Sequence, residues 1–160
     1  MLISLLATLV IVPVIGLIGS LLVPKSKERV IFSVALTSIL FELIVFLFLS
    51  YLWLGQGASP ISTSGVSLYT SDHYAFSIRF YFDTLSAVFF GMATMMTTLV
   101  FIFSRYYLHR EPGFKRFYYT VLLFFIGLSL IILAGNFEVL LVGWEFIGIS
   151  SVLLIAFYRD

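Results

Sequence analysis

The stretch LLVGWEFIGISSVLLIAFYRD, residues 140–160, sets one acidic side chain, Glu145, in an apolar run of about twenty residues. A helix needs about 20 predominantly apolar residues to cross the hydrocarbon core of a bilayer. The stretch therefore predicts a membrane-spanning helix that carries a carboxyl group near the middle of the bilayer.

The composition of the whole chain agrees with this interpretation. Of its 160 residues, 61% are hydrophobic, 18% aromatic and 11% charged, and the mean hydropathy is +1.13, whereas about a quarter of the residues of a soluble domain are charged. The formal net charge of +1 offers no excess of basic charge for binding nucleic acid, and the lack of cysteine excludes disulfides and thiolate metal sites. We expect an all-α integral membrane protein.

Apolar runs long enough to span a bilayer occur about five times, and we expect them to form one membrane domain over residues 1–160. The expected spans are Leu2 to Val23, Val30 to Leu54, Thr84 to Phe103, Phe117 to Leu133 and Glu138 to Phe157. Residues 55–82, between the second and third spans, are rich in Gly, Ser and Pro and end in alternating apolar and polar residues. This segment predicts an external loop that contains a short β-hairpin.

The positions of the basic residues predict the orientation in the membrane. Eight of the nine Lys and Arg residues follow the first, third and fifth spans, and Arg79 alone lies in the loop on the other side. Because cytoplasmic loops retain positive charge, we expect the N-terminus to face outward.

Glu138 and Glu145 are seven residues apart, so on a helix they share one stripe, with Glu145 about 10 Å deeper in the membrane. Gly148 lies on the same side and leaves room for a neighbouring helix or a water molecule. An ionised acid at this depth is costly, and such residues normally pair with a cation or titrate. Glu145 is therefore the main candidate for a proton-translocation site; the alternative is a neutral acid that is hydrogen-bonded for packing.

Two other acids are weaker candidates. Glu42 lies near the middle of the second span, where interhelical pairing and proton relay are both open. Glu138 begins the fifth span, where a carboxylate is favoured by the helix N-terminus.

The remaining polar residues predict structural roles. Asp83 precedes the third span and is expected to cap it. His73 and His109 are isolated and predict no metal site. The sequence contains no motif for a cofactor and no catalytic site for covalent chemistry.

Three segments together carry a resemblance to a known family: FDTLS at residues 82–86, RYYLHREPGFKRFYY at 105–119, and LAGNFEVLLVGWEFIGISSVLLIAFYRD at 133–160. They resemble the N-terminal region of the proton-translocating antiporter-like subunits of respiratory complex I, most of all the largest one. Related proteins include multi-subunit cation/proton antiporters and the membrane subunits of inorganic-carbon accumulation complexes. The resemblance is carried by about half of the chain.

The resemblance implies roles for individual residues. Glu145 corresponds to the family's glutamate on the fifth helix, which pairs with a lysine on a later helix and modulates its proton affinity. Gly143 and Trp144 match flanking motif positions with a packing role, and Asp83 matches a position at the outer end of the third helix. Glu42 and Glu138 match no family motif.

Family members have many more helices, and their lysines lie beyond the fifth. No Lys or Arg lies within the expected spans of this chain. We therefore expect either an N-terminal fragment, such as a split or truncated relative, or a short subunit that receives an intramembrane lysine from other membrane subunits.

Three functions remain open at this point. The first is proton or cation translocation within a larger assembly, which could include an NADH:quinone oxidoreductase-like translocase. The second is a proton-conducting membrane partner of an inorganic-carbon uptake complex with a large soluble-side subunit. The third is a structural assembly subunit. In each case we expect a multi-pass protein of an energy-transducing membrane, with the bacterial inner membrane favoured.

Overall fold

The computed structural model describes residues 1–71 and 74–158, so His73 and Arg159 lie outside the described residues. Five helices in this part of the chain are long and apolar enough to cross a membrane, which confirms the predicted all-α membrane fold. They are α1 (Leu2–Leu22), α2 (Glu28–Gly55), α3 (Thr84–Tyr107), α4 (Phe114–Ile132) and α5 (Phe137–Ile155), followed by a short 3₁₀ turn, η1 (Ala156–Tyr158). The orientation of the bundle in the bilayer stays a prediction.

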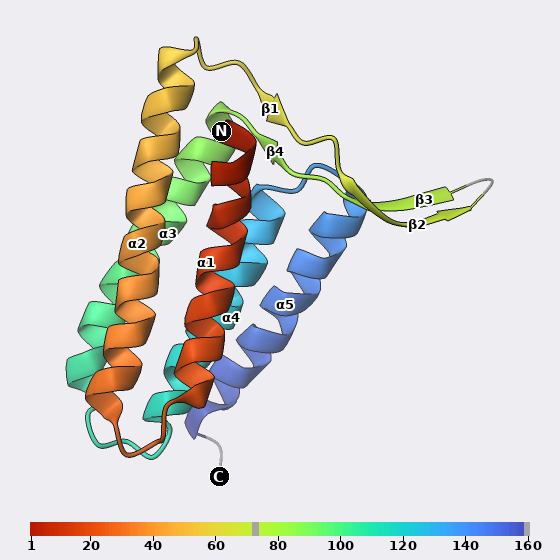
Figure 1. Ribbon diagram of the computed structural model, residues 1–160. Coiled ribbons are helices and arrows are strands. Elements are labelled where there is room, and N and C mark those ends of the chain that lie inside the picture. The colour runs from red at the N-terminus through yellow and green to blue at the C-terminus, as the bar shows by residue number, and fades with distance from the viewer. Residues whose placement is uncertain (72–73, 159–160) are drawn as a thin grey trace.

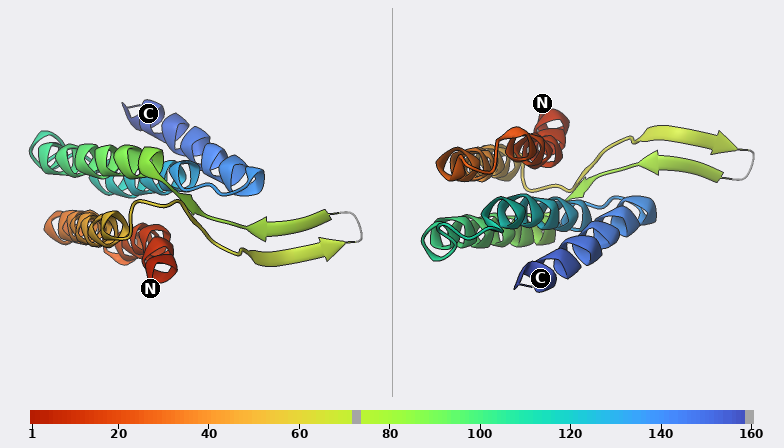
Figure 2. Two further views of the ribbon diagram at one scale, coloured as in Figure 1. Left: turned by 90° about the horizontal axis from the view of Figure 1, so that it is seen from above. Right: turned by 90° about the horizontal axis from the view of Figure 1, so that it is seen from below.

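The helices form two layers, with a fifth helix outside them. Figure 2 shows α1 and α2 as one layer and α3 and α4 as the other, while α5 crosses the outer side of α4 at an oblique angle. The connections between successive helices are short except the one between α2 and α3. As a result α4 packs against every other helix, whereas α5 packs against α4 and its own outer side is open.

The connection between α2 and α3 contains the predicted hairpin. Strands β2 (Val66–Ser71) and β3 (Tyr74–Ile78) pair antiparallel, and the short strands β1 (Ile61–Ser62) and β4 (Tyr81–Phe82) pair at its base. Figure 1 shows the hairpin projecting sideways from the end of the bundle where α1 begins.

The base of the hairpin is attached to the turn between α4 and α5. The amide of Gly135 donates to Arg79 O, and the amide of Tyr81 donates to Leu133 O, each at 2.9 Å. The Asn136 side chain caps α5 by accepting from Val139 N, and its amide nitrogen donates to Ser77 O. These contacts fix the start of α5 relative to the hairpin.

Aromatic side chains fill the interior between the two layers. Tyr118 is fully buried, its ring lies 5.1 Å from that of Phe101, and its hydroxyl donates to Phe101 O at 3.1 Å. Nearer the hairpin, Phe90 of α3 lies between Phe46 of α2 and Phe125 of α4. These contacts join α2, α3 and α4 into one core.

Two glycines set the contact between α4 and α5. A Cβ added at Gly143 would lie 2.8 Å from Gly127 O, and one added at Gly127 would lie 2.9 Å from Gly143 O. The two helix backbones touch, and close approach of this kind is a common way for membrane helices to gain packing energy. It also decides which side of α5 faces α4.

Basic residues at the start of α4 hold the ends of two other helices. Lys115 Nζ donates to Leu21 O and Val23 O, both at 2.8 Å, and so satisfies carbonyls at the end of α1. Arg116 donates to Phe157 O just after α5. The sequence indicated these residues only as a topology signal.

Candidate functional site

Glu145 lies in the middle of α5, eight residues after Phe137, or about 12 Å along the helix axis. Its side chain is exposed on the side of α5 that no other helix covers. Among the described residues, no hydrogen bond or ion pair reaches the carboxyl group. In a bilayer this face would put a carboxyl group against hydrocarbon, which is costly.

Apolar and small residues surround Glu145 on the same open face. Leu141, Ile149 and Val152 are 50%, 53% and 65% exposed, and nothing lies within 4 Å of a Cβ added at Gly148. The room beside Gly148 that the sequence predicted is therefore present and opens outward.

Glu138, unlike Glu145, lies beside side chains of other elements of the chain. It is half-buried at the start of α5, beside an apolar cavity of about 290 Å³ that Val10 of α1 and Phe80 also line. The two acids thus lie along one side of α5, with Glu138 beside the hairpin and Glu145 on the open face.

The two motif residues before Glu145 point in different directions. Gly143 is buried against α4, whereas Trp144 is 68% exposed. Gly143 therefore contributes to packing within the chain, and a packing role for Trp144 requires lipid or another polypeptide segment.

Glu42 has the opposite surroundings from Glu145. It lies on the buried face of α2 with 0% of its surface exposed, and neither carboxyl oxygen has a hydrogen-bond partner. One turn further along α2, Phe46 lies against Phe90 of α3. The sequence did not predict this burial.

The remaining polar residues have local partners. Asp83 Oδ1 accepts from Ser86 N at 2.8 Å, which is the expected cap of α3. His109 Nδ1 lies 3.0 Å from Glu28 Oε2, a pair that the sequence did not indicate because 81 residues separate its members. The described residues contain no group of three side chains able to hold a metal ion.

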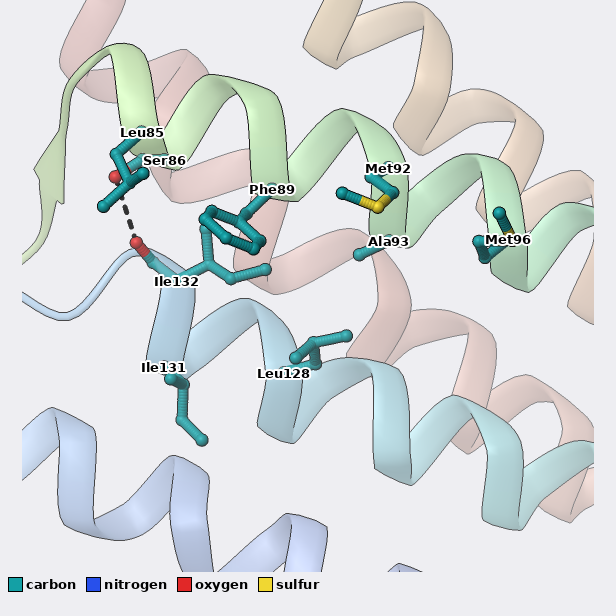
Figure 3. A pocket seen from close by; sticks show the side chains of 9 residues that line it. All are labelled: Leu85, Ser86, Phe89, Met92, Ala93, Met96, Leu128, Ile131 and Ile132. Atoms are coloured by element: carbon teal, nitrogen blue, oxygen red, sulfur yellow. Dashed lines mark hydrogen bonds between the residues drawn. The ribbon is translucent and has the colours of Figure 1, made fainter.

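A groove of about 550 Å³ between α3 and α4 has a different character (Figure 3). Its lining is apolar except for Ser86, whose hydroxyl donates to Ile132 O at 3.1 Å and is thereby satisfied. Its lining contains no titratable side chain.

Comparisons with known proteins find similarity over part of the chain. Residues 68–118 match the family model described as NADH-Ubiquinone oxidoreductase (complex I), chain 5 N-terminus. NADH-ubiquinone oxidoreductase chain 5 of Mytilus edulis is 30% identical over 120 residues, which is 74% of this chain and 21% of the relative. These matches confirm the predicted resemblance to the antiporter-like subunit family of complex I.

Two further members of the antiporter-like subunit family are similar over a shorter range. NADH-quinone oxidoreductase subunit L of Neisseria meningitidis is 37% identical over 84 residues, covering 52% of this chain and 12% of that protein. Chain 5 of Felis catus is 35% identical over 82 residues, covering 51% and 14%. The chain thus spans no more than about a fifth of the length of these relatives.

Proposed function

We propose that this chain acts in proton or cation translocation within a larger membrane assembly and that Glu145 is its titrating site. The observation that carries the proposal is the exposure of Glu145 in the middle of α5, without a partner among the described residues. Similarity to the antiporter-like subunit family supports the same function.

The partner of Glu145 in this proposal is a cation on a membrane helix outside residues 1–160. The five helices contain no Lys or Arg in their middle sections, so residues 1–160 do not supply this cation from an apolar core. A neighbouring helix could lie against Gly148 and bring a lysine beside the carboxyl group. The pair would then favour the ionised acid, and separation of the pair would favour proton uptake.

Glu42 is a second candidate for holding a proton, within the chain itself. A charged carboxylate buried without a partner would cost several kcal/mol, so the surroundings of Glu42 favour its neutral form. Glu138 lies nearer the hairpin end of the bundle than Glu145, at a position from which a proton could approach the stripe. Neither residue matches a family motif.

The names of the relatives favour a redox-linked complex in an energy-transducing membrane as the setting. The inorganic-carbon uptake complex and the structural assembly subunit are the alternatives. A zinc-bearing soluble partner in the purified assembly would favour carbon uptake, and proton transport that survives loss of the Glu145 carboxyl would favour a structural role.

The test is Glu145→Gln in the native assembly, with proton uptake into membrane vesicles followed by a pH-sensitive dye. We expect coupled transport to be lost while assembly is retained, because the amide keeps the shape of the side chain but cannot titrate. Transport at the unaltered rate would contradict the proposal.

Two variants control this experiment. Glu145→Asp keeps the carboxyl group and should retain part of the transport rate. Trp144→Phe alters the neighbouring exposed side chain without touching a titratable group and should leave transport near its normal rate. A loss of transport in Trp144→Phe equal to that in Glu145→Gln would show that any change on this face is disruptive.

A further inference from the structure

A second polar site lies at the other end of the bundle, where α2 begins and α3 ends. It is a cavity of about 230 Å³. Charged and aromatic side chains line it, among them Glu28, Arg29, Phe32, Arg105, Tyr106 and His109. No residue of α5 lines this cavity, and it plays no part in the proposed translocation.

The two arginines of the cavity have no carboxylate partner. Within the described residues, the side chains of Arg29 and Arg105 form no hydrogen bond or ion pair. Arg105 Cζ lies 4.6 Å from the centre of the Phe32 ring. This stacking engages the face of the guanidinium and leaves the N–H donors at its edge available for an anion.

The one acid in the cavity is already engaged. Glu28 Oε2 lies 3.0 Å from His109 Nδ1, so the imidazole N–H satisfies that carboxylate oxygen. The cavity contains two guanidinium groups, of Arg29 and Arg105, and one carboxylate, of Glu28. Its net charge is therefore positive in either protonation state of His109.

The N-terminus of α2 adds donors to the same place. The helix is 28 residues long, and among the described residues no side chain caps its first turn and no acceptor pairs with the amides of Glu28 and Arg29. Amides at a helix N-terminus favour anions, phosphate groups in particular. The amides and the two arginines therefore attract the same kind of ligand.

The surroundings of the cavity favour a lipid as the source of the anion. Exposed aromatic and apolar side chains of α3 continue from it along the bundle, with Phe103, Tyr106 and Tyr107 between 70% and 78% exposed. Tyrosines are enriched where the headgroups meet the hydrocarbon. A ligand with a phosphate and acyl chains would contact both the cavity and this strip, whereas a free phosphate would contact only the cavity.

We propose that this cavity binds the phosphate headgroup of an anionic phospholipid. Arg29, Arg105 and the first amides of α2 contact the phosphate, and the acyl chains run along the exposed side of α3. Basic pockets between membrane helices on the cytoplasmic side commonly bind such headgroups, and the predicted orientation puts the cavity on that side.

The test is native mass spectrometry of the full chain, or of the assembly that contains it, titrated with phosphatidylglycerol and separately with phosphatidylcholine. We expect preferential binding of phosphatidylglycerol. The double variant Arg29→Gln, Arg105→Gln should bind it roughly ten- to thirty-fold more weakly, since each basic residue near an anionic surface contributes about a factor of five. Arg110→Gln, which removes a charge outside the cavity, is the matched control and should lose much less.

Two additional experiments, a charge-preserving double variant and a competition with inorganic phosphate, complete the test. The charge-preserving pair Arg29→Lys, Arg105→Lys should retain most of the binding, which keeps the test valid if the glutamine variants fold poorly. Inorganic phosphate at millimolar concentration should compete only weakly. Equal binding by the glutamine variants, an equal loss in Arg110→Gln, or displacement of the lipid by inorganic phosphate would each overturn the proposal.

Discussion

Two glutamates near the middle of two helices of this protein have opposite surroundings. Glu42 of α2 is fully buried between the helix layers, and both of its carboxyl oxygens lack a partner. Glu145 of α5 is exposed on a face that no described helix covers. The surroundings of Glu42 lie within these five helices, whereas our proposal requires that those of Glu145 be completed by a polypeptide segment outside them.

The difference follows from what each helix packs against. α2 contacts α1, α3 and α4, and aromatic rings cover its inner face. α5 contacts α4 through the Gly127–Gly143 approach, which turns Glu145 away from the bundle. The same residue type can therefore lie in the interior of the bundle or on a face that the described helices leave open.

The largest expected effect comes from placing a lysine at Glu42, with the same substitution at Glu145 as the comparison. Glu42→Lys would bury a cation without a partner, and we expect it to lower the free energy of unfolding by about 3–5 kcal/mol or to prevent folding. Glu145→Lys should change the stability of the isolated chain by less than about 0.5 kcal/mol, because the site is exposed. Thermal unfolding in detergent measures both, and equal losses would remove the distinction between the two sites.

The next effect concerns the contact that turns Glu145 outward. Gly143→Ala puts a Cβ 2.8 Å from Gly127 O, and overpacking of this kind should cost about 1–3 kcal/mol. Gly148→Ala is the matched control in the same helix, since nothing lies within 4 Å of its Cβ. We expect it to be neutral or slightly stabilising. An equal loss of stability in Gly148→Ala would show that the Gly127–Gly143 contact is not what makes Gly143 sensitive to substitution.

The smallest expected effect comes from replacing Glu42 with leucine, which tests whether the carboxyl group lacks hydrogen-bond partners. Glu42→Leu replaces two polar oxygens that lack partners with apolar groups, so we expect the free energy of unfolding to stay the same or rise by about 1 kcal/mol. Glu145→Leu should leave the unfolding of the isolated chain unchanged but stop transport in the assembly. A clear loss of stability in Glu42→Leu would mean that this carboxyl makes a favourable bond in the folded protein.

The sequence predicted the elements of this fold well. The five spans lie within a few residues of the helices, the hairpin is present, and Asp83 caps α3. These features depend on local signals: runs of apolar residues, alternation in the loop, and a capping side chain directly before a helix.

The sequence did not predict which faces of the helices are buried. Membrane helices are apolar all around, so hydrophobic periodicity does not distinguish a side that faces another helix from a side that faces lipid. Glu42 therefore gave no sign of its burial and Glu145 none of its exposure. The Glu28–His109 pair and the capping of α1 by Lys115 join segments far apart in the sequence, and no local pattern indicates them.

The most direct measurement replaces Ile149, one turn from Glu145 on the open face of α5, with a photo-crosslinking amino acid in native membranes. We expect a crosslink to a membrane helix that carries a lysine or arginine within its apolar span, identified by sequencing the joined peptides. The same amino acid at Phe103, on the exposed side of α3, is the reference for a lipid-facing position. Lipid adducts alone at Ile149, in membranes that transport protons, would contradict the claim that Glu145 is completed by another polypeptide segment.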